Sequence, residues 1–412
     1  MAFFVSAYCS ADRIPKRLWF LTMAFFVLEG DDLNPNERSK EMIKEATGKV
    51  VRKEDLTEEE MRGVMEEITT GSASDSQIAS FITALRLKEE TPEEITVAAK
   101  SIKEKVSTIH GGEDGVCLDR EEITAERETI LSTVKGLTEG TKTFNVSTAT
   151  AFVVAGGGIK VAKHGRKSVS PLCGSADVVE ALGINLDMTS TQLERCLKKI
   201  GICFLYEPIA QNGLRHIISL REKIGIRTIF NLLEPLINPA GAAIQVLGVY
   251  ESRLTETMAA VLKNLGIQKG LVVHGHDTLD EMSITGKTKI TEFKGGRIKT
   301  YLINPEDLGL KRGKLIEIEG GDKKKNAEII VEILRGARGA KRDITVLNAA
   351  AVFMIAGRTK TLDEGIELAN QSIDSGEAFS RLERLIKFTN TERRFLRDPY
   401  EVEMGISPGG HF

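Results

Sequence analysis

Residues 140–148, with the sequence GTKTFNVST, combine a glycine with several hydroxyl side chains immediately before a predicted helix. Backbone N–H groups, hydroxyls and the positive end of a helix dipole are the donors that phosphate oxygens require. The stretch therefore predicts a phosphate-binding site. The alternative is an ordinary capped helix start.

A second stretch, residues 161–170 with the sequence VAKHGRKSVS, places three cations beside a glycine at the end of a short apolar strand. Charge-assisted hydrogen bonds from such cations, together with two serine hydroxyls, suit a diphosphate. Residues 174–177, GSAD, open the next helix and add further N–H groups. A solvated charged loop is the alternative explanation for this stretch.

The third stretch, residues 272–281 with the sequence VVHGHDTLDE, is an apolar strand that ends in a loop with three carboxylates. Magnesium takes one or two protein carboxylates and completes its shell with substrate phosphates and water. The two histidines could instead indicate zinc, but a tetrahedral ligand set is not evident. A polar strand-to-helix loop without a metal remains the other alternative.

The segments around these stretches predict two kinds of architecture. Residues 36–106 show apolar positions at helical spacing and predict a small helical bundle. Beyond residue 112, short β-rich runs alternate with helices, which is typical of a mostly parallel sheet covered by helices. The predicted strands are residues 159–162, 226–230, 243–250, 270–274 and 299–303, and the predicted helices are 175–200, 255–265 and 324–335.

The domain prediction divides the chain into four parts. Residues 1–40 form a loose extension, 41–110 a helical domain, 111–390 an α/β domain and 391–412 a C-terminal tail. Residues 175–205 are predicted to return to the helical domain. Basic residues precede an apolar run at 18–28, as in a signal peptide, but the run is about half the ~20 residues that a membrane span needs.

The composition bounds the possible partners. The net charge of −3 gives no general attraction to nucleic acid or to an anionic membrane, so neither is an expected partner. The 5 cysteines are scattered without a Cys-x-x-Cys pair, which argues against a metal ribbon and fits a reducing cytoplasm.

Taken together, the motifs resemble those of the anthranilate phosphoribosyltransferase family and occur in the same order as in that family. The resemblance extends from about residue 44 to residue 388. The matching segments are GSASDSQI at 71–78, NVST at 145–148, KHG at 163–165, GSAD at 174–177, GIRTIFN at 225–231, PLINP at 235–239, QVLGVY at 245–250, and VHG at 273–275 with LDE at 279–281. The resemblance implies a helical domain plus an α/β domain with the active site in the cleft between them. It also implies a cytoplasmic homodimer that acts in tryptophan biosynthesis. The reaction would transfer phosphoribose from phosphoribosyl diphosphate to anthranilate or a related small aromatic amine, with Mg²⁺.

The resemblance carries roles to individual positions. The residues matched to phosphoribosyl diphosphate binding are Glu139, Thr143, Asn145, Ser147, Thr148, Lys163, His164, Gly165 and Ser175. Ser147, Asp280 and Glu281 match the magnesium ligands, and Arg166 and Arg221 lie at acceptor positions. An arginine suits the acceptor because its planar fork pairs with both oxygens of a carboxylate. No residue is predicted as a covalent nucleophile.

The sequence departs from the family pattern at the predicted site. The family's Gly-Thr-Gly-Gly-Asp-Gly loop stands here as KGLTEG, residues 135–140, so three glycines become Lys135, Leu137 and Thr138. Glycines let the backbone approach a diphosphate and adopt positive φ, which a Cβ resists. Arg166 replaces an asparagine, and Glu234 replaces a glycine, near the acceptor. These changes predict a shared scaffold with an altered acceptor, an altered donor or both.

Two function classes follow. One is a transferase of this family, which the retained Asp280 and Glu281 favour because a pure binding protein has little need of a magnesium pair. The other is a non-catalytic paralogue that binds a nucleotide or nucleic acid, which the altered glycine loop favours. The absence of net positive charge weighs against nucleic acid.

Overall fold

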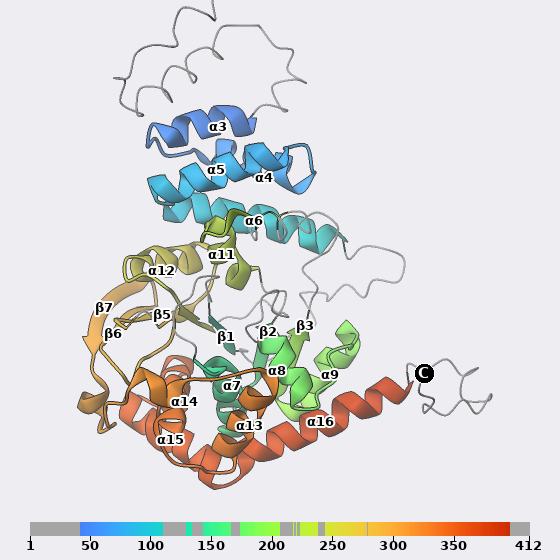
Figure 1. The fold of residues 1–412 in the computed structure, drawn as a ribbon, viewed down its shortest axis with the longest axis vertical. Coiled ribbons are helices and arrows are strands. Elements are labelled where there is room, and N and C mark those ends of the chain that lie inside the picture. Colours follow the sequence, from blue (N-terminus) through green and yellow to red (C-terminus); the bar gives the residue numbers. More distant parts are fainter. Residues whose placement is uncertain are drawn as a thin grey trace, which may run out of the picture.

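The computed structural model describes residues 42–109, 129–133, 143–165, 174–206, 217, 220, 223–237, 244–277 and 279–395. Within these residues, a helical bundle stands on one side of an α/β body, and the long α16 (Glu377–Phe395) lies at the far side (Figure 1). Among the described helices, none is both long enough and apolar enough to cross a bilayer.

Within the described residues, the bundle has four helices. They are α3 (Met42–Val51), α4 (Glu58–Thr69), α5 (Asp75–Lys88) and α6 (Pro92–Ile109). Thr57 and Ser74 cap α4 and α5 in reciprocal capping boxes with Glu60 and Gln77. The predicted apolar stripes are buried: Met61, Val64, Met65 and Ile68 on α4, and Ile78, Phe81, Ile82 and Leu85 on α5.

The α/β body is built on one 7-stranded sheet in the order β3-β2-β1-β4-β5-β6-β7. Its strands are β1 (Thr129–Thr133), β2 (Val161–Gly165), β3 (Ile202–Tyr206), β4 (Ile244–Gly248), β5 (Lys269–Gly275), β6 (Thr288–Lys294) and β7 (Arg297–Ile303). The first five strands in that order are parallel to their neighbours, and β6 and β7 add an antiparallel edge. The prediction of a mostly parallel central sheet with a helical domain is confirmed.

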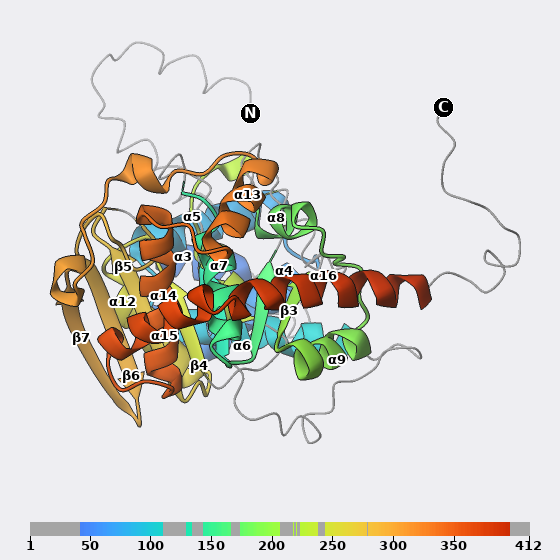
Figure 2. The ribbon, with the colours of Figure 1, turned by 90° about the horizontal axis from the view of Figure 1, so that it is seen from below.

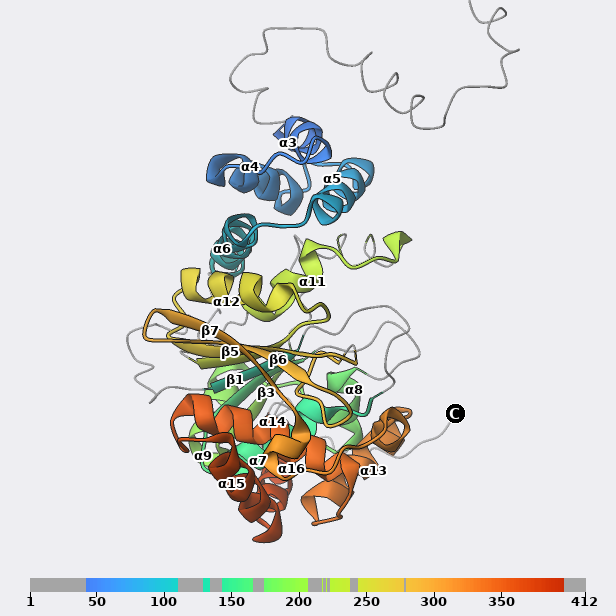
Figure 3. The ribbon, with the colours of Figure 1, turned by 90° about the vertical axis from the view of Figure 1, so that its left-hand side faces the viewer.

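Helices cover both faces of the sheet, and alternation along the strands divides the core. α12 (Leu254–Asn264) lies between the sheet and the bundle, whereas α7 (Val146–Gly156) and α14 (Ala340–Ala356) lie on the opposite face (Figure 3). On β5, Leu271 and Val273 join the cluster around α7, while Val272 joins the cluster that continues into the bundle. The bundle therefore shares one hydrophobic core with one face of the sheet.

The remaining elements close the body on the α7 side, where α16 crosses beneath the other helices (Figure 2). They are α8 (Ser175–Ala181), α9 (Ser190–Ile200), η2 (Pro305–Leu308), η3 (Leu315–Ile318), α13 (Lys323–Leu334) and α15 (Leu362–Asp374).

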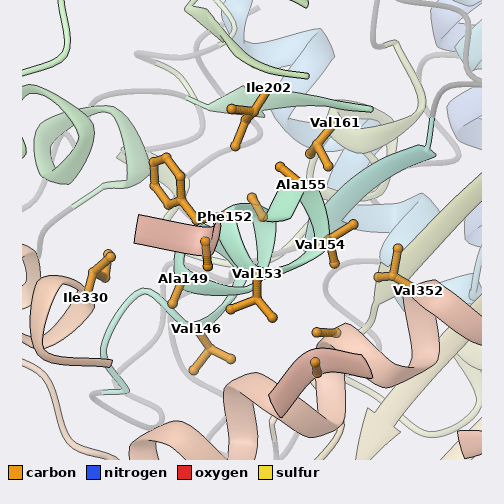
Figure 4. Packing of buried hydrophobic residues seen from close by; sticks show 14 of the residues in the cluster. Val146, Ala149, Phe152, Val153, Val154, Ala155, Val161, Ile202, Ile330 and Val352 are labelled. Carbon is orange, nitrogen blue, oxygen red and sulfur yellow. The ribbon is translucent and has the colours of Figure 1, made fainter. Parts of the chain in front are cut away.

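The centre of the body is α7, which is rich in apolar residues and buried along residues 146–155. Phe152 and Ala155 point toward Val161 and Ile202 of the sheet, while Val146 and Val153 point toward the neighbouring helices (Figure 4). A helix enclosed on all sides is held by packing and cannot rotate without opening cavities. Its N-terminus, at Asn145, is therefore fixed relative to the sheet.

Several predicted elements differ from the structure. Residues 226–230 are not a strand: after Thr228 the chain forms α11 (Ile229–Leu233) and then η1 (Glu234–Leu236), despite its β-branched residues. Residues 175–200 form α8 and α9 with a break between them rather than one helix. Strands β1, β3 and β6 were not predicted.

The predicted return of residues 175–205 to the helical domain is also wrong. The apolar residues of α8, α9 and β3 belong to the core around α7, with α13 and α16 as neighbours. The segment that does pack against the bundle is α11 with η1, whose Ile229, Phe230 and Leu233 join the bundle core. An apolar helix face shows that a segment is buried, but it does not identify the partner.

A polar cluster lies where the bundle meets the sheet. Glu90, between α5 and α6, is only 5% exposed, and neither of its carboxylate oxygens has a hydrogen-bond partner among the described residues. Burial raises the pKa of Glu90, and Arg86 and Arg253 offset part of that effect. The guanidinium of Arg227 stacks on the Tyr250 ring at 4.1 Å, and burial raises the pKa of Tyr250 to about 12.

This cluster predicts a pH-dependent stability. Because the folded-state pKa of Glu90 lies above its unfolded value, its stability contribution is present below the unfolded pKa and is lost as pH rises through the folded pKa. We expect Glu90→Gln to raise the free energy of unfolding at pH 8, and the gain to vanish near pH 4. Urea unfolding across this range measures it, with exposed Glu93→Gln as the control. Lower stability of Glu90→Gln at pH 8 would show that the arginines dominate.

Candidate active site at the carboxyl edge of the sheet

The parallel strands bring the three predicted site stretches to one edge of the sheet. β2 carries Lys163 and ends at Gly165, and β5 leads into Asp280 and Glu281. The entry to α7 follows β1, which lies between β2 and β4. Since the carboxyl ends of parallel strands meet at the same edge, the topology gathers these stretches where α/β sheets usually bind ligands.

The entry to α7 presents Asn145 as its N-cap, but without the usual bond from the cap side chain to the first-turn amides. Instead, Asn145 Oδ1 accepts a hydrogen bond of 2.9 Å from Asn326 Nδ2. Just before it, Thr143 forms an isolated bridge with Glu319. Ser147 and Thr148 follow in the first turn, and the fully buried Thr148 hydroxyl has no hydrogen-bond partner within the described part of the chain.

Lys163 is 3% exposed in the middle of β2, where it is in register with Phe204 of β3. Strand alternation places its side chain on the same face as Val161, which packs in the core around α7. Lys163 therefore brings a buried cation to the same side of the sheet as α7. His164 and Gly165 complete the strand, and Ser175 is the first residue of α8.

Asp280 and Glu281 are adjacent carboxylates, 9% and 2% exposed, in the loop that follows β5. Asn348 of α14, 66 positions beyond Met282, holds this loop: its Oδ1 accepts from Met282 N–H at 3.0 Å and its Nδ2 donates to Met282 O at 2.9 Å. Gly275 N–H donates to Leu279 O at 2.8 Å. The carboxylate pair is thus fixed from both sides.

Gly248, the last residue of β4, lies directly beneath this loop. A Cβ built on Gly248 would lie 1.5 Å from the carbonyl oxygen of Asp280. Only glycine therefore permits the loop to approach the end of β4 as closely as it does. Neither Gly248 nor Asn348 is a site residue that the sequence indicated.

The donor set fits magnesium better than zinc. In the described part of the chain, no three His, Cys, Asp or Glu side chains gather as a metal cage would require. Two adjacent carboxylates are hard oxygen ligands, and Mg²⁺ uses few protein ligands because it keeps water and substrate phosphates. Asp280 and Glu281, with Ser147, could hold such an ion.

Other predicted site residues lie outside the described residues. Glu139, Arg166 and Arg221 belong to this group, as does the whole stretch 135–140. The backbone of His164 and Gly165 is described, but the side chain of His164 is not. The roles of these positions stay predictions.

Comparison with known proteins agrees with this arrangement. Residues 136–379 match the model of the glycosyl transferase family a/b domain, and residues 44–106 match that of its helical bundle domain. The anthranilate phosphoribosyltransferase of Geotalea uraniireducens is 51% identical over 349 residues, which cover 85% of this chain and 100% of that protein. That of Symbiobacterium thermophilum is 46% identical, over 84% of this chain and 97% of its own length.

Solved structures give the same result. The anthranilate phosphoribosyltransferase from Thermus thermophilus superposes with a TM-score of 0.73 at 35% identity, over 84% of this chain and 99% of that one. The Saccharomyces cerevisiae enzyme in complex with PRPP and Mg superposes with a TM-score of 0.71 at 25% identity, over 85% and 99%. With the helical bundle, the sheet and the order of the motifs in agreement, the chain belongs to the anthranilate phosphoribosyltransferase family of glycosyl transferases.

Proposed function

We propose that this protein transfers the phosphoribosyl group of phosphoribosyl diphosphate to the amine of anthranilate. The observation that carries the proposal is the buried pair Asp280 and Glu281, held at the same edge of the sheet as the entry to α7. The relatives named anthranilate phosphoribosyltransferase, which are 46% to 51% identical over nearly their whole length, support anthranilate as the acceptor.

The chemistry needs no covalent nucleophile. The bond between the anomeric carbon and the diphosphate breaks, a bond from the anthranilate nitrogen forms, and the nitrogen loses a proton. Lys163, with its buried ammonium, would stabilise the negative charge that develops on the departing diphosphate. Asn145, Ser147 and Thr148 would hold the phosphate oxygens, because an amide, two hydroxyls and the first turn of α7 provide donors in one place.

Asp280, Glu281 and Ser147 would hold Mg²⁺, which when bound supplies positive charge to the diphosphate oxygens. The protein's contribution is to keep the two carboxylates in place through Asn348 and the close approach at Gly248. A fixed pair loses little freedom when the ion and its substrate arrive, which favours a productive geometry.

At the acceptor side, we propose that Arg221 pairs with the anthranilate carboxylate through its planar fork. Arg166 would lie near the same pocket and offset Glu234. We also propose a homodimer, supported by two large apolar side chains exposed on the bundle, Val51 and Leu87. Because single apolar residues are common on protein surfaces, the oligomeric state has to be measured directly, by sedimentation velocity.

The test of the function is fluorescence of phosphoribosylanthranilate with the wild-type protein, Mg²⁺ and both substrates. We expect turnover, with a KM for phosphoribosyl diphosphate higher than that of a variant that carries the family loop. A variant that restores the family loop, by Lys135→Gly, Leu137→Gly and Thr138→Gly, is expected to lower this KM by about tenfold, since close backbone contact is worth roughly one strong hydrogen bond.

Three outcomes decide between the function classes. Turnover by the wild type supports the transferase. If only the variant with the restored loop turns over, the natural protein belongs to the non-catalytic class, and the function that it lacks is binding of phosphoribosyl diphosphate. No turnover and no binding of phosphoribosyl diphosphate by either form, measured by isothermal titration, would contradict the proposal.

A further inference from the structure

Asn326 lies far from the predicted site motifs in sequence but touches one of them. It is 3% exposed in the first turn of α13, and its side chain donates a hydrogen bond to Asn145, 181 positions away. The segment that leads to it, residues 318–321, runs along the entry to α7. There Phe144 N–H donates to Ile318 O at 3.2 Å, and Thr143 bridges Glu319.

Close packing fixes this segment against α7. A Cβ on Gly320 would lie 2.7 Å from Phe144 Cα and 2.5 Å from Asn326 Oδ1, so only glycine allows both contacts. The next residue, Gly321, donates its backbone N–H to Asn326 Oδ1 at 2.8 Å. The side chain of Asn326 is therefore held by the backbone of its own loop.

These hydrogen bonds determine which way the amide of Asn145 points. A backbone N–H can only donate, so the atom of Asn326 that Gly321 contacts must be the oxygen. The nitrogen of Asn326 must then donate to the oxygen of Asn145, over 2.9 Å. The remaining polar atom of the Asn145 side chain is Nδ2, and its two hydrogens make no hydrogen bond with any described residue.

We propose that Asn326 is a positioning residue that orients Asn145 so that its amide presents N–H donors, and not its oxygen, to the diphosphate or ribose phosphate. The same bond occupies the oxygen that would otherwise cap α7, which explains why Asn145 makes no side-chain cap. The first-turn amides of α7 then remain directed toward the anion. This inference rests on the proposed function of Asn145 as a donor-substrate ligand.

A double-mutant cycle tests whether Asn326 acts through Asn145. Asn326→Leu keeps the branching at Cγ and removes both hydrogen bonds, and Asn145→Ala removes the proposed ligand. We expect Asn145→Ala to raise the KM for phosphoribosyl diphosphate by about tenfold and Asn326→Leu by roughly three- to tenfold. The double variant should match Asn145→Ala alone, because residues that act as one unit are not additive. The KM for anthranilate should stay within about twofold of the wild-type value.

Two further variants separate positioning from damage to α13. Asp322→Ala removes the N-cap of the same helix, whose carboxylate accepts from Lys325 N–H at 2.8 Å, without touching Asn145. It should lower the melting temperature as Asn326→Leu does and leave the KM for phosphoribosyl diphosphate unchanged. If Asn326→Leu does not fold, Asn326→Asp takes its place. The Asp carboxylate still accepts from Gly321 N–H, but it cannot donate, so Asn145 must turn its Nδ2 toward residue 326.

The results distinguish the inference from the proposed function. Wild-type protein that neither binds phosphoribosyl diphosphate nor turns it over refutes the function and the inference together. A wild-type protein that binds the substrate, with additive effects in the cycle or an equal rise in both KM values, refutes the inference alone. Loss of donor affinity confined to Asn326 and Asn145, without additivity, supports it.

Discussion

Replacing Asp280 with Asn and Glu281 with Gln in one variant is expected to lower kcat/KM by about a thousandfold, which corresponds to ~4 kcal/mol of transition-state stabilisation. Both substitutions keep the side-chain volume, and the loop remains anchored by Asn348, so the fold should persist. The loss arises because two neutral amides cannot hold a divalent cation against the charge of a diphosphate. Initial rates over a Mg²⁺ titration measure it.

The chain offers a matched control for this variant. Asp363 and Glu364, in the first turn of α15, form a second adjacent Asp-Glu pair, and both are exposed. Asp363→Asn with Glu364→Gln makes the same chemical change at the surface and should leave kcat/KM and the Mg²⁺ dependence unaltered. A site variant that keeps the Mg²⁺ dependence of the wild type would show that the cation is held elsewhere.

The elements that the sequence predicted best are those with strong local signals. β4 and β5 are short runs rich in apolar residues, and α12 and α13 have clear apolar stripes, so these elements lie where they were expected. The error at residues 226–230 has a physical reason. Two isoleucines and a threonine favour extended structure by propensity, but Thr228 is buried and stands at the N-cap of α11, whose apolar face packs against the bundle.

The candidate site divides in the same way. Asn145 and the pair at 280–281 are visible in the sequence because each lies in a compact motif at the end of a strand or the start of a helix. The residues that hold them are not visible, because their role comes from contacts across the fold. Asn348 reaches Met282 over 66 positions, and Asn326 reaches Asn145 over 181. Gly320 and Gly321, just before α13, are the local signal of the Asn326 contact, because adjacent glycines mark a close approach of two backbones.

Gly248→Ala is expected to impair the site, although Gly248 is not among the proposed ligands of the substrate or the metal. The added Cβ would lie 1.5 Å from the Asp280 carbonyl oxygen and 2.5 Å from its carbonyl carbon, and both are backbone atoms that cannot rotate away. The loop must shift, which should cost about 1–3 kcal/mol of stability and lower kcat/KM by about a hundredfold, as a displacement near 1 Å does.

The control for Gly248→Ala is Gly48→Ala in α3, where the nearest atom to a new Cβ is Arg52 Nη1 at 3.8 Å. That substitution should stabilise the bundle slightly, because alanine favours a helix over glycine by about 1 kcal/mol. The apparent Mg²⁺ affinity separates the two effects of Gly248→Ala. If it falls together with kcat/KM while the folded fraction stays near unity, the methyl group has displaced the carboxylate pair. An unchanged Mg²⁺ affinity and full activity would mean that the loop can move without consequence, and that the close approach at Gly248 serves packing alone.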